Sequence, residues 1–143
     1  MRFFAADTHL SSNYFSELSS LHSEFSDTAE TTIYAAPIIF DRNAHKVPPL
    51  VRLSDIVWCA AGISGLYPGS TIAIPTSVYS IPLSLAEMVG GWDTGAEAIG
   101  EDMHMYLKCY FALAGHLTMR TIYSPGKQTF IPPHFRPSLR SVQ

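Results

Sequence analysis

Apolar side chains recur at helical spacing near the end of the chain, and this stretch gives the clearest structural signal. They are spaced three and four residues apart, so they share one face of a helix: Met103, Tyr106, Leu107, Tyr110, Phe111 and Ala114. Gly115 follows and is expected to stop the helix, while Gly100 precedes its start. The pattern therefore predicts an amphipathic helix that buries these apolar residues.

The rest of the pattern predicts short strands that alternate with helices. Strands are expected at 2–6, 31–40, 77–81 and 117–123. In the second run, Pro37 predicts either an edge position or a break into two strands. A first helix, capped by Ser12, is expected to carry one face formed by Tyr14, Phe15, Leu18, Leu21 and Phe25. A second helix, at 54–62, is expected to carry one face formed by Leu53, Val57, Ala60 and Ala61. A third helix is expected between Pro82 and Gly90. This order favours an α/β fold, with a mixed sheet and flanking helices.

Composition indicates a folded domain rather than a disordered chain. The 143 residues are 47% hydrophobic and 15% charged, which suits one domain with a real core. The net charge of −3 gives no support for a nucleic-acid surface. The longest apolar stretch, 56–75, contains Gly62, Gly65, Pro68 and Gly69, which is too broken for a membrane helix. The first residues do not resemble a signal peptide, because Asp7 and His9 follow closely.

Two parts of the chain fall outside the main pattern. Residues 126–143 are rich in proline and basic side chains, so we expect an extended or disordered tail after a domain at 1–125. Cys59 and Cys109 lack the spacing of a metal site, and each is expected to act as an apolar filler.

Glu101 and Asp102 stand in the first turn of the helix predicted near the end of the chain. Free backbone N–H groups and the positive end of the helix dipole favour negative charge there, so these carboxylates are expected to stay ionised at neutral pH. Acidic residues at a helix start are common stabilisers. Spacing alone therefore favours a simple capping role for the pair.

A second interpretation comes from the order of motifs: GGWD, a short spacer, Glu101-Asp102, then a hydrophobic helix that ends in Ala-Gly. This order resembles the acidic-pair motif of family-2 glycosyltransferases, which have the GT-A fold. The resemblance implies that Asp102 is the general base that deprotonates the acceptor hydroxyl. It also implies that Glu101 supports the position and charge of Asp102.

The stretch AADTHLSSNYF resembles the Asp-x-Asp motif of the same family. That motif holds Mn²⁺ or Mg²⁺ against the phosphates of a nucleotide-sugar, and here the metal-binding and cofactor-binding role would fall to Asp7. The chain departs from the family pattern, because Ala5 stands where the first aspartate is expected. One carboxylate plus substrate phosphates still suits Mg²⁺, though with reduced affinity. Without the resemblance, a single aspartate in this position is most simply a turn former.

The segment between these motifs resembles the family's glycine-rich acceptor region, which implies acceptor-binding roles for Gly91 and Trp92. Stacking of Trp92 on a sugar ring is one interpretation. The other is that this tryptophan anchors the hydrophobic core.

The resemblance runs from Phe4 to about Pro125, and it implies a partial GT-A domain, because nothing in this sequence corresponds to the family's N-terminal nucleotide-binding half. Family members are often held at membranes by helices outside this segment. Two functions follow. One is inverting transfer of a sugar from a nucleotide-sugar donor to a hydroxyl of a glycan or other acceptor. The alternative is a non-catalytic remnant or interaction module that retains the fold. With either function, we expect a partner chain or self-association to cover the sheet edge that the missing half leaves exposed.

Overall fold

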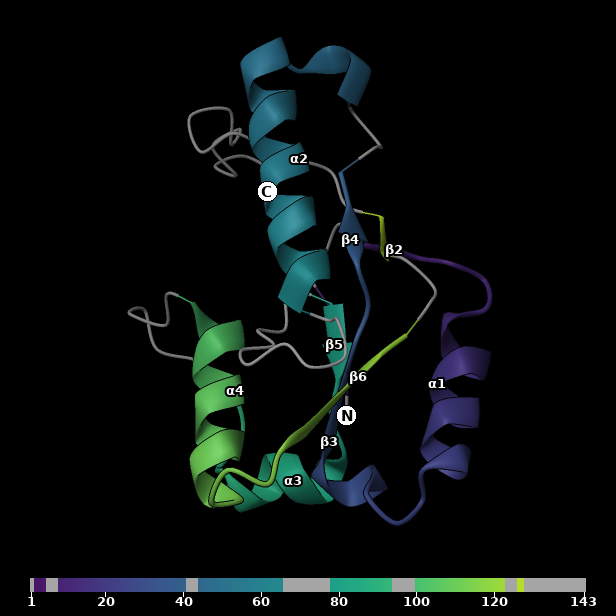
Figure 1. The fold of residues 1–143 in the computed structure, drawn as a ribbon, viewed down its shortest axis with the longest axis vertical. Helices are drawn as coiled ribbons and strands as arrows, with labels where there is room; N and C mark the ends of the chain where they lie inside the picture. The colour runs from purple at the N-terminus through teal and green to yellow at the C-terminus, as the bar shows by residue number, and fades with distance from the viewer. Residues whose placement is uncertain are drawn as a thin grey trace, which may run out of the picture.

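The computed structural model describes residues 2–4, 8–40, 44–65, 78–93, 100–122 and 126–127. Figure 1 shows a central sheet with α1 (Tyr14–Glu24) on one side and α4 (Glu101–Ala112) on the other. The short helix α3 (Leu83–Met88) lies at the end of α4 that is far from the acidic pair. The mixed sheet with flanking helices confirms the predicted α/β class.

Two small sheets are present among the described residues. The first has the order β1-β5-β3-β6, with strands Arg2–Phe4, Val78–Ser80, Thr32–Ala35 and Thr118–Thr121. In it, β5 runs antiparallel to both of its neighbours, while β3 and β6 run parallel. The second sheet has the order β2-β7-β4, with strands His9–Leu10, Gly126–Lys127 and Ile38–Ile39.

Side chains alternate across the first sheet and build a core on each face. Ile33, Ala35 and Tyr79 point to one side, where they pack with α3 and α4 residues such as Met105 and Cys109. The intervening residues Tyr34, Ala36 and Val78 point to the other side and pack with Tyr14 of α1. All four residues of β3 are therefore buried, with successive side chains on opposite faces of the sheet.

Most predicted elements are present, with some changes of length. The run at 31–40 does break at Pro37 into β3 and β4. The strand expected at 77–81 is β5, and the helix between Pro82 and Gly90 is α3. Residues 126–127, which we placed in the tail, pair as strand β7, while 128–143 lie outside the described residues. The helix expected at 54–62 is longer, because α2 spans Pro49–Gly65.

The predicted buried face of α4 was wrong for most of its residues, although Tyr106 is half-buried against the core. Met103, Leu107, Tyr110 and Phe111 are exposed, whereas Met105 and Cys109 are fully buried against the sheet. Since Met105 and Cys109 are four residues apart and Asp102 lies one turn before Met105, all three share the inward face. The helix is thus rotated relative to its most apolar stripe, and this rotation turns Asp102 toward the protein.

Other expectations about individual side chains had mixed outcomes. Cys109 is buried and acts as a filler in the core, whereas Cys59 is only half-buried, and both are free thiols. Phe15, expected on the buried face of α1, is 45% exposed beside the fully buried Tyr14. In the part of the chain that the structure describes, no helix has the length and hydrophobicity needed to cross a bilayer.

Candidate active site

Asp102 lies in the first turn of α4, just after Gly100, which has a positive φ of 78° that glycine adopts without strain. Its carboxyl group is half-buried, and its Oδ1 atom is buried with no hydrogen-bond partner among the described residues. Burial, with a smaller contribution from the neighbouring charge of Glu101, raises the pKa of Asp102 from 3.8 to about 6. Most Asp102 side chains are still ionised at pH 7, as expected from the sequence, but the carboxylate is more basic than an ordinary aspartate.

A simple capping role does not account for this environment. A capping carboxylate accepts hydrogen bonds from backbone N–H groups, which stabilise its charge and lower its pKa. Asp102 shows the opposite shift, and its buried Oδ1 accepts nothing from the described residues. An unpartnered buried carboxylate destabilises the folded protein, so it calls for an explanation other than stability.

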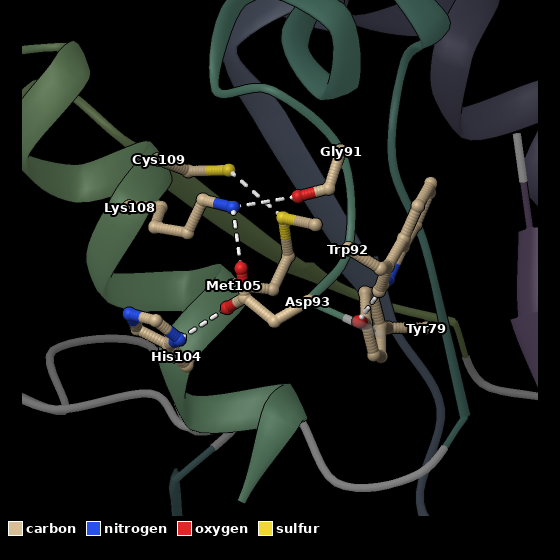
Figure 2. A network of polar contacts seen from close by, with 8 residues as sticks. All are labelled: Tyr79, Gly91, Trp92, Asp93, His104, Met105, Lys108 and Cys109. Carbon is tan, nitrogen blue, oxygen red and sulfur yellow. Dashed lines mark hydrogen bonds and ion pairs between the residues drawn. The ribbon is translucent and has the colours of Figure 1, made fainter. Parts of the chain in front are cut away.

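Tyr79 and Trp92 contact each other in the core shared by the sheet, α3 and α4. The Trp92 Nε1–H donates a hydrogen bond of 2.7 Å to the phenol oxygen of Tyr79, and both side chains are drawn in Figure 2. Burial raises the pKa of the Tyr79 phenol, and the negative charges of Asp102 and Glu101 raise it further. The negative charges of the acidic pair therefore act on the Tyr79 phenol.

Lys108 and His104 of α4 contact the loop at 90–93. Figure 2 shows the Lys108 ammonium group between two acceptors, the Gly91 carbonyl at 2.7 Å and the Asp93 carboxylate at 3.3 Å. His104 Nδ1 contacts the second oxygen of Asp93. Gly91 also has a positive φ of 75°, and its N–H donates to Ala86 at the end of α3. Three contacts therefore fix this loop on the helix that carries the acidic pair.

The predicted site residues fall into two groups. Glu101 and Asp102 stand in the first turn of α4, and Gly91 and Trp92 lie in the loop at 90–93, which Lys108 and His104 of the same helix contact. Trp92 is half-buried and packs against the core of α3 and α4, as the anchor interpretation requires, while its acceptor-binding role stays a prediction. Asp7, the predicted metal ligand, lies outside the described residues, as does Ala5.

Sequence reasoning missed the residues that hold this region together. Tyr79 falls within the strand expected at 77–81 and Lys108 within the helix expected after Gly100, but neither was singled out. Asp93 and Lys108 are fifteen residues apart in the sequence, so no local spacing rule pairs them. The one available signal for Lys108 was its place in the sequence. It is a charged residue one turn before the end of an otherwise apolar helix, directly before Cys109.

The described residues contain no cluster of three or more His, Cys, Asp or Glu side chains that would hold a metal ion. The donor type of the predicted ligand is nevertheless appropriate, because a single aspartate such as Asp7 supplies the hard oxygen that Mg²⁺ and Mn²⁺ prefer.

Comparison with known proteins agrees with the motif resemblance. A search of curated proteins and a search of solved structures found no match. The family model described as glycosyl transferase family group 2 matches residues 5–141. The match includes the acidic pair, the loop at 90–93 and the strands of both sheets after β1. Since it spans nearly the whole sequence, the chain belongs to glycosyl transferase family group 2.

Proposed function

We propose that this domain transfers a sugar from a nucleotide-sugar donor to an acceptor hydroxyl with inversion, and that Asp102 is the general base. Family membership supports a glycosyltransferase-like protein. The observation that carries the role of Asp102 is its half-buried carboxyl group, with an unpartnered Oδ1 and a pKa of about 6. A base is most effective when its pKa lies near the working pH.

The proposed reaction is a single displacement. Asp102 accepts the proton of the acceptor hydroxyl while that oxygen attacks the anomeric carbon of the donor sugar. The bond between the anomeric carbon and the phosphate oxygen breaks, and the nucleoside diphosphate leaves with the electron pair. At pH 7 roughly nine-tenths of Asp102 is in the ionised, proton-accepting form when its pKa is about 6.

Glu101 supports this base through charge. Its carboxylate raises the pKa of Asp102 and thus the proton affinity of the base. Trp92 and Gly91 are proposed to face the acceptor, because the loop that carries them is fixed to α4 by Lys108. An acceptor placed against this loop would be next to the acidic pair.

The cofactor in this proposal is Mn²⁺ or Mg²⁺, with Asp7 as the protein ligand. When bound, the ion would supply positive charge to the diphosphate of the donor. With only one carboxylate in the motif, most of its ligands would be phosphate oxygens and water.

The role of Asp102 is tested by Asp102→Asn, which keeps the size of the side chain but accepts no proton. Release of nucleoside diphosphate from a panel of nucleotide-sugars would be measured with and without acceptors. We expect the rate of release to fall roughly a hundredfold or more, the usual contribution of a general base. The activity of the parent protein should also fall tenfold per pH unit below about pH 6, because Asp102 becomes protonated there. Asp27→Asn, a change in an exposed turn on the α1 side, is the control. Activity that survives in Asp102→Asn would remove Asp102 from the mechanism.

The metal is tested separately by titrating a nucleoside diphosphate into the protein with Mg²⁺, with Mn²⁺ and with a chelator. Binding should need the metal, and Ala5→Asp should tighten it, since a second carboxylate adds charge and a second ligand. Equal binding in chelator would refute the metal site. Absence of binding under every condition, including in Ala5→Asp, would favour the non-catalytic alternative.

A further inference from the structure

Helix α2 turns its most apolar face away from the protein. Leu50, Leu53 and Val57 follow helical spacing and are 80%, 57% and 60% exposed. The inward face, which packs against β4, instead carries Asp55 and the half-buried Cys59. The apolar face expected at 53–61 thus exists, but this part of the structure leaves it uncovered.

Such a face is costly to leave in water. Burying one Leu or Val side chain contributes about 1.5–3 kcal/mol, and several neighbours here are exposed together. Ile56 and Trp58 on the same helix are 64% and 66% exposed. Contiguous apolar surface of this kind usually marks a binding site.

A groove of about 420 Å³ borders this face between α2 and β4. Its lining residues are Ile39, Phe40, Arg52, Asp55, Ile56, Cys59 and Ala60. Asp55 is only 5% exposed, and its Oδ1 has no hydrogen-bond partner among the described residues. Burial raises the pKa of this carboxyl group, and no ion pair joins it to Arg52 within the described part of the chain. The groove therefore suits an apolar segment that also brings a hydrogen-bond donor or positive charge.

The last described residues of the chain lie beside β4, which contributes Ile39 to this groove. Strand β7 pairs in parallel with β4, with Gly126 opposite Ile38 and Lys127 opposite Ile39. Strand β7 thus ends opposite Ile39, one residue before Phe40, and both of these β4-side residues line the groove. In Figure 1, β4 lies alongside α2.

Residues 128–143 have the matching chemistry. They contain four large apolar side chains, two arginines and no acidic residue; these are Phe130, Ile131, Phe135, Leu139, Arg136 and Arg140. Sixteen extended residues span roughly 50 Å at about 3.3 Å each, whereas the seventeen residues of α2 span only about 25 Å. Being attached beside the groove, the segment has a local concentration on the order of millimolar.

We propose that segment 128–143 docks on α2, with its apolar side chains on the groove and on the Leu53 and Val57 face, and with an arginine against Asp55. This intramolecular contact covers apolar surface that is otherwise exposed. It also supplies the donor that the buried carboxyl group lacks.

Cys59 provides a native reporter, because it lines the groove and is half-buried, while Cys109 is fully buried elsewhere. The rate of alkylation of Cys59 would be measured in the full chain and in the double variant Phe130→Ser/Phe135→Ser. We expect alkylation to become about tenfold faster in the variant, because the proposed cover is lost. Phe111→Ser, at a 74% exposed position on α4, is the matched control and should leave the rate unchanged. Equal rates in all three proteins would overturn the proposal.

Disulfide trapping separates docking from a general loosening of the fold. Cysteine would be placed singly at Phe130, Ile131, Phe135 or Leu139, and the chain oxidised mildly at low concentration. At least one variant should form an intramolecular disulfide with Cys59, whereas His116→Cys, at an exposed site after α4, should not. If no variant cross-links, or if cross-links form only between chains, the segment is not the occupant. The second result would assign the face to another copy of the protein.

Discussion

The substitution Asp102→Asn should make the protein more stable while removing activity. The half-buried carboxylate has no hydrogen bond at Oδ1, and its pKa is raised from 3.8 to about 6. Each pKa unit corresponds to about 1.4 kcal/mol, so the full rise sets an upper limit of about 3 kcal/mol. Because the side chain keeps some exposure to water, we expect a gain on the order of 1 kcal/mol.

The gain should depend on pH in a defined direction. A raised pKa means that the folded state holds a proton that the unfolded state has released, so ionisation opposes folding as pH rises from about 4 to about 6. Asparagine has no such ionisation. The variant should therefore differ little from the parent near pH 4 and show its full advantage above about pH 6.

Urea denaturation of both proteins across this pH range is the appropriate assay. Glu101→Gln serves as a second variant, because it removes the smaller cause of the shift and should move the midpoint of the pH dependence downward. If Asp102→Asn is less stable than the parent at pH 7, or if its advantage is the same at every pH, the buried-base argument is wrong.

Three further predictions concern the loop at 90–93 and the core. Lys108→Met keeps the side-chain stem but removes the hydrogen bond to Gly91 and the ion pair with Asp93. It should lower the free energy of unfolding, measured by urea denaturation, by about 1–2 kcal/mol, and no loss would mean that the lysine does not fix the loop. A double-mutant cycle of Trp92→Phe and Tyr79→Phe should give a coupling of about 1 kcal/mol for their hydrogen bond, and additive effects would contradict it. Leu85→Ala should lower the free energy of unfolding by about 2–5 kcal/mol, because Leu85 is buried in the core. Leu83→Ala, at a half-exposed site, should lower it by under about 0.5 kcal/mol, and similar losses in the two variants would refute the assigned packing.

The sequence by itself determined which elements form and in what order. Pro37 predicted an edge position or a break into two strands, and the break is what the structure has. Pro82 and Gly90 bounded α3 correctly, because proline and glycine act through their own backbone geometry. The glycine before Glu101 likewise fixed the start of α4. These signals are local, so one sequence is enough to find them.

Only the tertiary structure decided which faces of the helices are buried. The sheet contacts Met105 and Cys109 of α4 rather than its most apolar stripe. In α2 the apolar face is exposed, and the side that carries Asp55 packs near β4. Periodicity shows that a helix has an apolar face, but the shape of the neighbouring layer selects the face that packs. That selection turned Asp102 inward and raised its pKa, and it joined Lys108 to a loop that precedes it by fifteen residues or more. The motif could thus be found from the sequence, whereas its electrostatics depended on how α4 sits against the sheet.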